Sequence, residues 1–349
     1  MRLNSSRKLP LSLVLLVVLG SVLLLALGAL ACSDFNRNEQ NPLSGFGVGS
    51  GLKIVASVFA PYDFSRAIVG EEAEVRMLIP PGAETHSFEP SPADIIMLNT
   101  ADVFIYVGGE SDAWLEKIIN SLDNPDLTLI RLIDIVEPLE EVALEGMDLS
   151  GAEAGATHDH DHDGDATHDH AEDADLDEHV WTSLRNAQII ISALADAFSK
   201  LDPEHAEVFA DNAASLNKEL DALDQRIVKI VSNAKRTTVV FGDRFPFRYF
   251  AEDYGLTCYA AFPGCSTAVD TNPATIAFLI DTVREQGIPV VFYIELSDQR
   301  IARQVAEETG AETLLFHSAH NISKDDMNAG ATYLSLMRSN ADNLEVALN

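Results

Sequence analysis

Residues 186–233 read NAQIIISALADAFSKLDPEHAEVFADNAASLNKELDALDQRIVKIVSN and contain no glycine. Apolar side chains recur through this stretch at helical spacing, and Asp202-Pro203 divides it into two helices. The second helix, on the order of 30 residues from Glu204, is unusually long for a globular protein. We therefore expect it to be a rigid connection between two lobes, one on either side of the stretch.

The sequence on both sides of these helices alternates short apolar runs with amphipathic runs. Such alternation predicts parallel strands joined by helical crossovers. The expected strands lie at 53–58, 75–79, 103–107 and 127–132, and then at 237–241, 257–262, 289–294 and 312–316. One helix is expected to begin at residue 60, and the others are expected at 93–99, 114–119, 247–254, 273–286, 299–309 and 325–348. The predicted fold class is α/β: two Rossmann-like lobes, each a four-stranded, mainly parallel sheet with flanking helices.

The N-terminus has the pattern of an exported protein. Three basic residues precede an apolar run at 11–30, as in a signal peptide. The run ends in GALACS at 28–33, which resembles a bacterial lipobox, so Cys32 is expected to carry a lipid on the outer face of the cytoplasmic membrane. An uncleaved transmembrane anchor is the alternative. Residues 33–51, rich in Asn, Gly and Ser, predict a flexible tether.

The composition limits the partners and the number of domains. The 349 residues include 55 acidic and 23 basic side chains, a formal net charge of −32, which argues against binding to nucleic acid. The length leaves about two domains after the leader. The expected divisions are a leader at 1–32, a tether at 33–51, an N-terminal lobe at 52–185, linking helices at 186–235 and a C-terminal lobe at 236–349.

The two remaining cysteines are Cys258 and Cys265. In an oxidising compartment they could form one disulfide across a short loop. Two free thiols are the alternative.

Residues 151–178 carry no signal of folded structure. They contain eleven carboxylates and no basic residue, which predicts a disordered loop. Histidines alternate with these carboxylates, a composition typical of weak and flexible metal chelation. A solvated low-complexity insert is the alternative. The histidines of this loop are His158, His160, His162, His168 and His170.

Several possible metal ligands directly follow predicted strands. His86 comes after the second strand, Asp243 after the fifth, Glu295 after the seventh and His317 after the eighth. Ligands of open α/β sheets gather at the carboxyl ends of the strands. If these ends face each other across a cleft, imidazoles and carboxylates would line it, as a borderline dication such as Zn²⁺ requires. His179, directly after the acidic loop, is a further candidate.

These motifs together resemble the zinc/manganese family of solute-binding proteins of ABC importers, whose lobes are joined by a rigid helix. The resemblance covers nearly everything from Leu52 to Leu348. PGAETHSFEP at 81–90 is similar to the family's first-ligand motif, and DEHVW at 177–181 is similar to the second. An acidic His-rich loop just before the second motif is typical of zinc-importing members. The stretch ATYLSLMRSN at 331–340 resembles the family's C-terminal helix.

The resemblance implies a residue of this sequence for each of three metal-ligand positions of the family. His86 and His179 match the first and second ligands, and His317 stands at the fourth position, where the family commonly has Asp. The third position departs from the family pattern, because the usual His after Val-Val-Phe is replaced by Gly242-Asp243.

Several groups could fill the third position. Asp243 is one candidate, although the next residue, Arg244, could neutralise it. Glu295 and His320 are fallback candidates. Three histidines completed by a water molecule or a carboxylate form a further alternative.

The resemblance implies a monomeric receptor, not an enzyme, that captures Zn²⁺ outside the membrane and delivers it to an ABC permease and its ATPase. Three imidazoles favour Zn²⁺ over Mn²⁺, which prefers oxygen ligands. An exported zinc metallohydrolase is an alternative, because three protein ligands and a water also describe catalytic zinc, but the sequence has no H-E-x-x-H or G-x-S-x-G motif. A surface adhesin with a structural metal is the third class, and no repeat supports it.

Overall fold

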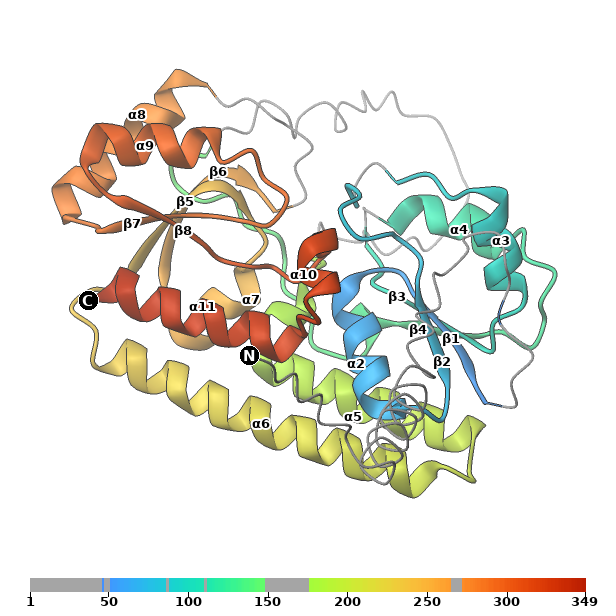
Figure 1. The fold of residues 1–349 in the computed structure, drawn as a ribbon. Coiled ribbons are helices and arrows are strands. Elements are labelled where there is room, and N and C mark those ends of the chain that lie inside the picture. Colours follow the sequence, from blue (N-terminus) through green and yellow to red (C-terminus); the bar gives the residue numbers. More distant parts are fainter. Residues whose placement is uncertain (1–45, 47–50, 86–87, 110–111, 148–175, 265–271) are drawn as a thin grey trace, which may run out of the picture. The chain divides into compact units, whose positions relative to one another are not determined.

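Eight strands form two parallel sheets in the computed structural model, which describes residues 46, 51–85, 88–109, 112–147, 176–264 and 272–349. The strands are β1 (Lys53–Ala56), β2 (Glu74–Met77), β3 (Val103–Tyr106), β4 (Thr128–Arg131), β5 (Thr238–Phe245), β6 (Thr257–Pro263), β7 (Val290–Tyr293) and β8 (Glu312–Leu315). Their order is β2-β1-β3-β4 in one sheet and β6-β5-β7-β8 in the other, with parallel neighbours throughout (Figure 1). The predicted fold class, two four-stranded α/β lobes, is confirmed.

Helices cover both faces of each sheet. The lobe helices are α2 (Phe59–Val69), α3 (Pro92–Asn99), α4 (Ala113–Ile119), α7 (Arg248–Tyr254), α8 (Pro273–Gln286), α9 (Arg300–Thr309), α10 (Lys324–Asn328) and α11 (Tyr333–Leu348). Successive side chains of a strand point to opposite faces of the sheet, so alternate residues belong to different hydrophobic cores. In β5, Val240 belongs to the core beneath α8 and α9, whereas Val239 and Phe241 belong to the large core on the other face. Both faces of the strand are therefore buried, as is usual for parallel sheets.

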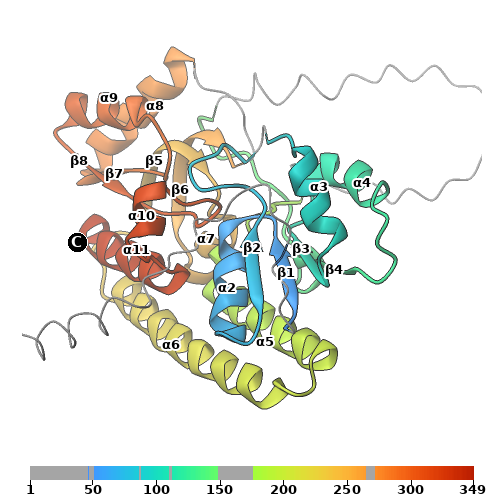
Figure 2. The same ribbon diagram turned by 45° about the vertical axis from the view of Figure 1, so that its right-hand side comes forward.

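The linking helices α5 (Leu184–Leu201) and α6 (Ala206–Ser232) pack against elements of both lobes. The break at Asp202 agrees with the predicted division, and α6 is 27 residues long. The Asn212 side chain of α6 donates a hydrogen bond to the Ile68 carbonyl of α2 at 2.9 Å. Toward the other end of α6, Asp224 accepts one from the Tyr254 hydroxyl of α7 at 2.8 Å. Figures 1 and 2 show α6 running beside α5 and reaching α11, so that one helix contacts both halves.

The C-terminal helix is shorter than the sequence predicted. The expectation of one helix at 325–348 is wrong, because α10 ends at Asn328 and α11 begins at Tyr333. Gly330 lies between them with a φ of +76°, a left-handed conformation that glycine adopts without strain. Thr332 then caps α11 by accepting a hydrogen bond from the Ser335 backbone N–H.

Strand β5 is longer than predicted. The sequence placed its end at residue 241, but pairing with β6 continues to Phe245 through a register shift between Phe241 and Arg244. The extra length reflects a β-bulge, which a periodicity of two cannot reveal. Asp243 therefore lies within the strand and does not follow it.

Several sequence predictions lie outside the described residues. These are the leader, the Cys32 lipobox, most of the tether, Cys265 and the histidines at 158–170. No helix in the described part of the chain is long and apolar enough to cross a membrane. Cys258 is a buried free thiol, and burial raises its pKa.

The last three residues of the predicted acidic loop are part of the folded structure. Leu176 forms a β-bridge with Glu140, and the Asp177 backbone N–H donates to the Leu139 carbonyl at 2.9 Å. The side chains of Asp177 and Glu178 are buried. Acidic composition alone could not distinguish these two carboxylates from the nine that precede them in the predicted loop.

Candidate metal centre

A cavity of about 40 Å³ lies where the two lobes meet, inside the compact unit formed by residues 45–349. Thr85 and Glu84 line it from the loop after β2, and His179 lines it from the segment before α5. The second lobe contributes Glu295 after β7 and His320 after β8. This volume is enough to hold a water molecule or a single ion.

His179 is oriented by a carboxylate two residues before it. Its Nδ1 lies 3.1 Å from Oδ1 of Asp177, and its backbone N–H donates to the same oxygen at 2.8 Å. Both side chains are almost completely buried, with exposed fractions of 1% and 2%. A neutral imidazole that donates Nδ1–H to a carboxylate carries its lone pair on Nε2, the nitrogen that then binds metal. This pair is therefore arranged as in metal-ligating histidines.

The field around His179 is negative. Burial alone favours the neutral ring, but the hydrogen bond and charge of Asp177, with the charges of Glu178 and Glu141, together outweigh it and raise the pKa of His179 above 6.5. The same carboxylates would stabilise a dication at Nε2. A proton and a metal therefore compete for this nitrogen.

The segment that carries His179 is fixed to the second lobe. The Tyr249 hydroxyl of α7 donates to the Asp177 carbonyl at 2.7 Å and accepts from the Leu139 backbone N–H at 3.0 Å. The Trp181 indole N–H donates to the Ser318 carbonyl at 2.8 Å. These bonds hold the position of His179 relative to the ends of β7 and β8.

His320 is the histidine of the second lobe that lines the cavity with His179. Their ring centroids are 5.1 Å apart and the rings are nearly perpendicular, at 88°. Two imidazoles bound through Nε2 to one tetrahedral Zn²⁺ at ~2.1 Å have centroids about 5 Å apart. The spacing of His179 and His320 is therefore compatible with a shared metal.

Glu295 is held by both donors of one residue. The Ser318 backbone N–H donates to Oε2 of Glu295 at 2.8 Å, and the Ser318 hydroxyl donates to Oε1. Oε2 also lies 3.5 Å from Nδ1 of His317. Because Ser318 also accepts the Trp181 bond, it connects the His179 segment to this carboxylate.

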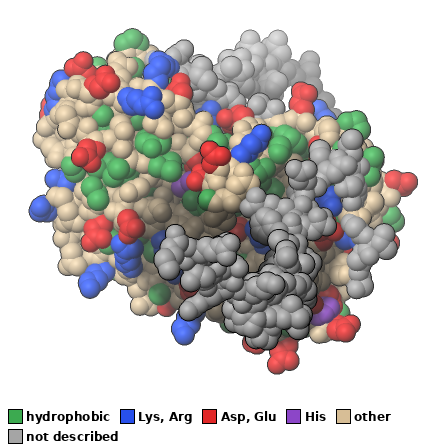
Figure 3. All heavy atoms as spheres, viewed as in Figure 1, with side chains coloured by type: hydrophobic (Ala, Val, Ile, Leu, Met, Phe, Trp, Pro, Cys, Tyr) green, Lys and Arg blue, Asp and Glu red, His purple; other side chains and the backbone are tan. Residues whose placement is uncertain are grey.

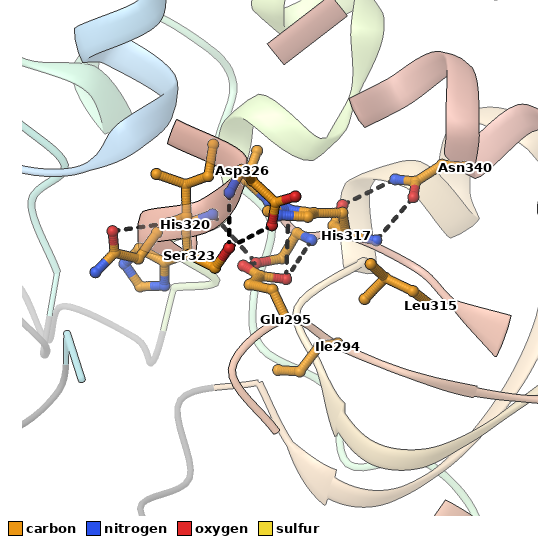
Figure 4. Close-up of polar contacts among 12 residues, drawn as sticks. Ile294, Glu295, Leu315, His317, His320, Ser323, Asp326 and Asn340 are labelled. Atoms are coloured by element: carbon orange, nitrogen blue, oxygen red, sulfur yellow. Dashed lines mark hydrogen bonds and ion pairs between the residues drawn. The ribbon is translucent and has the colours of Figure 1, made fainter. Parts of the chain in front are cut away.

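His317 lies beside Glu295 but does not line the cavity (Figure 4). Its backbone N–H and carbonyl both bond to the Asn340 side chain, at 2.7 and 2.8 Å. Its Nδ1 accepts from the Ala319 backbone N–H at 2.9 Å, which places the proton of a neutral ring on Nε2. Nε2 is buried and has no hydrogen-bond partner among the described residues. A buried nitrogen without a partner is costly unless something binds it.

Asp243 belongs to a second cavity, of about 250 Å³, which is next to the first and shares Glu295 with it. Oδ1 of Asp243 accepts from the Arg244 backbone N–H at 2.9 Å, and Oδ2 accepts from the Ile294 backbone N–H at 3.4 Å. Burial raises the pKa of Asp243, although hydrogen bonds from Ser297 and these N–H groups oppose the rise. Asp243 is thus separated from the cavity that His179 and His320 line.

The ZnuA family model, described as zinc-uptake complex component A, periplasmic, matches residues 54–347. The chain belongs to this family.

Several named proteins can be aligned with most of this ZnuA-family chain. The zinc-binding lipoprotein AdcA of Streptococcus pneumoniae serotype 4 is 29% identical over 317 residues, 91% of this chain and 58% of AdcA, so the chain spans less than two thirds of that relative. The high-affinity zinc uptake system protein ZnuA of Bacillus subtilis is 27% identical over 303 residues, 86% of this chain and 88% of that protein. The crystal structure of the Zn(II)-bound ZnuA-like domain of Streptococcus pneumoniae AdcA matches with a TM-score of 0.66 at 26% identity, covering 85% of this chain and 99% of that chain.

The predicted ligands of this ZnuA-family chain are only partly brought together. His179, His320 and Glu295 line one cavity, His317 contacts Glu295, and Asp243 lines the neighbouring cavity. Within the described ranges, no three His, Cys, Asp or Glu side chains are grouped closely enough to hold a metal ion. His86 and the His-rich loop lie outside those ranges.

The sequence did not identify two residues as parts of the candidate metal centre. Ser318 holds Glu295 through its backbone N–H and its hydroxyl. Arg244 lines both cavities, where the sequence suggested only that it could neutralise Asp243. Its position next to Asp243 was the signal in the sequence.

Proposed function

We propose that this chain captures Zn²⁺ in the cleft between its lobes and delivers it to an ABC permease and its ATPase. The observation that carries the proposal is the buried Asp177–His179 pair, which directs Nε2 of His179 to a cavity that His320 also lines. The names of the relatives, a zinc-binding lipoprotein and a zinc uptake protein, support the same metal. Imidazole ligands favour Zn²⁺ over Mn²⁺.

The proposed ligands combine the motif and the geometry. His179 and His320 supply two imidazoles, and His86, which follows the cavity residue Thr85, supplies a third. The fourth ligand is His317, through its buried Nε2. Ligation through Nε2 would require the ring proton to lie on Nδ1, so the bond that Nδ1 accepts from the Ala319 N–H would be given up, and Glu295, 3.5 Å away, would accept that proton.

Direct ligation by Glu295 is the alternative for the fourth position, because this carboxylate already lines the cavity. The two arrangements differ in which variant loses zinc. If His317 is the ligand, His317→Ala removes most of the affinity and Glu295→Gln only part of it.

The remaining proposals concern export and delivery. The leader is cleaved before Cys32, which is lipidated and becomes the mature N-terminus. Residues 33–51 tether the folded body to the outer face of the membrane, and the protein acts as a monomer. The histidines at 158–170 bind additional metal weakly. Acidic and basic side chains are interspersed on the face drawn in Figure 3. The formal net charge of −32 argues against binding to nucleic acid.

The family match favours binding over the two alternatives from the sequence, a metallohydrolase and an adhesin. A zinc hydrolase needs an open ligand position that a substrate can reach. The sequence contains no H-E-x-x-H or G-x-S-x-G motif that would supply the catalytic groups of such an enzyme.

Competitive zinc titration with a fluorescent chelator tests the proposal. His179→Ala and His320→Ala should each reduce zinc affinity by more than about tenfold. His205→Ala is the matched control, because His205 also contacts a carboxylate, Asp202, but lies at the start of α6. Equal affinities for all three variants would contradict the proposed site.

A further inference from the structure

Arg244 places a permanent positive charge in the wall of the cavity proposed to hold zinc. Its side chain lines both the small cavity and the larger neighbouring one. A guanidinium stays protonated at all physiological pH values. A dication and this cation would therefore repel each other across a space of about 40 Å³.

The guanidinium pairs with a carboxylate of the opposite lobe. Nη1 of Arg244, at the end of β5, lies 3.5 Å from Oε1 of Glu84, in the loop after β2. The Glu84 side chain is about half exposed, at 47%, whereas that of Arg244 is 20% exposed. A long contact with a half-exposed partner contributes little, so other charges can displace it.

The second cavity offers Arg244 another position. Asp243 and Asp298 line its wall, together with Arg244 itself. Its volume of about 250 Å³ is several times that of the first cavity, enough to admit a guanidinium. Ionised Asp243 would be stabilised by an approaching cation, which offsets the cost of its burial.

We propose that Arg244 is an affinity-determining residue that competes with zinc for the cleft and withdraws toward Asp243 when the metal binds. In the metal-free protein the guanidinium pairs with Glu84 and links the lobes. When zinc arrives, repulsion moves the guanidinium into the second cavity, next to Asp243. This inference rests on the proposed zinc function and assigns Asp243 a role as the acceptor of Arg244 rather than as a ligand.

Charge removal at Arg244 is the first test. Zinc affinity of the full-length protein is measured by chelator competition, and release is followed by stopped flow after addition of excess chelator. Arg244→Gln and Arg244→Met should bind zinc at least about tenfold more tightly than the wild type and release it more slowly. Arg244→Lys, which keeps the charge, should stay near the wild type. Unchanged or weaker binding in the neutral variants, or equal tightening in the lysine variant, would overturn the proposal.

Arg248→Gln is the matched control. It removes one positive charge four residues away, where Arg248 pairs with Glu252 at 2.8 Å on α7 and does not line either cavity. Its zinc affinity should change less than that of Arg244→Gln. Equal tightening would point to the overall charge and would contradict a specific role of Arg244.

A double-mutant comparison separates the two roles of Asp243. If Asp243 receives the guanidinium, Asp243→Asn weakens zinc binding in the wild type but has little effect in Arg244→Gln. If Asp243 is a zinc ligand, the loss appears in both backgrounds, and the proposal is wrong. Loss of zinc binding in every protein, the wild type included, would instead remove the proposed function. Thermal unfolding of each variant shows that the comparison involves folded protein.

Discussion

The Nδ1 atom of His179 and the Oδ1 atom of Asp177 form a buried pair at 3.1 Å, two residues apart in the chain. The backbone of Asp177 is itself held in place, because its N–H donates to the Leu139 carbonyl and its carbonyl accepts from the Tyr249 side-chain hydroxyl. One short motif thus contains a proposed ligand and the group that orients it.

Asp177→Asn tests this orientation directly. Loss of the charge weakens the hold on Nδ1–H and makes His179 a poorer ligand, so zinc affinity should fall about 10- to 100-fold. Asp202→Asn is the control, because Asp202 makes the same kind of contact with His205, at 2.7 Å, away from the cavity. Chelator competition measures both variants. A loss of the same size in the control would rule out a specific role for the pair.

Zinc binding should weaken on acidification. A metal binds the neutral ring, and the pKa of His179 is raised above 6.5, so the proton begins to compete at a higher pH than for an ordinary histidine. Affinity should therefore be highest on the alkaline side of that pKa and fall as the pH decreases through it. In Asp177→Asn the fall should shift to lower pH. Competition titrations between about pH 5.5 and 8 measure this change. A wild-type affinity that stays constant over this range would contradict the prediction.

In the metal-free protein, the contribution of His179 to folding stability should depend on pH in the opposite direction to zinc affinity. A pKa that is raised on folding contributes stability that is present below the unfolded pKa and is lost as the pH rises through the folded pKa. Zinc should therefore stabilise the protein most at neutral and alkaline pH. Thermal unfolding with and without zinc, across the same pH series, measures the difference. A zinc-induced shift that grows on acidification would contradict the assignment.

Gly242→Ala tests the packing of β5 beside Asp243. A Cβ at Gly242 would lie 2.3 Å from the Ala302 backbone of α9, so the substitution must move the helix away from the strand. The free energy of unfolding should fall by about 1–3 kcal/mol. Gly255→Ala is the control: its Cβ would meet nothing within 4 Å, although its φ of +63° costs about 1 kcal/mol. Urea unfolding that shows Gly242→Ala to be the milder change would disprove the packing argument.

Deletion of Thr157–Asp175 tests the His-rich loop. The weak zinc sites should disappear and the tight site should remain, because the proposed ligands lie outside the deleted stretch. Calorimetric titration distinguishes the two classes by affinity. Loss of the tight site would make the loop part of it.

The strands could be predicted because each is a short apolar run flanked by amphipathic helices, as Val290–Tyr293 illustrates. The break before α11 could not, because it depends on the left-handed backbone of Gly330 and on the Thr332 cap, whereas the apolar spacing continues through it. The end of β5 was missed for a related reason. A bulge between Phe241 and Arg244 adds strand length without changing composition.

Sequence reasoning reached His179, which lines the cavity, through the local motif DEHVW at 177–181. The Asp177–His179 pair is written in five consecutive residues, whereas the grouping of His320 with His179 depends on contacts between residues more than a hundred positions apart. The sequence ranked Asp243 above His320, because strand-end placement was its guide. In the structure Asp243 lies within β5 and lines the neighbouring cavity, whereas His320 lies beside His179.

A crystal structure of the zinc-loaded protein, with anomalous data on both sides of the zinc edge, tests the central claim most directly. We expect one strong zinc peak between Nε2 of His179 and the ring of His320, with the Arg244 guanidinium turned toward Asp243. Absence of that peak from crystals that hold zinc elsewhere in the protein would contradict it.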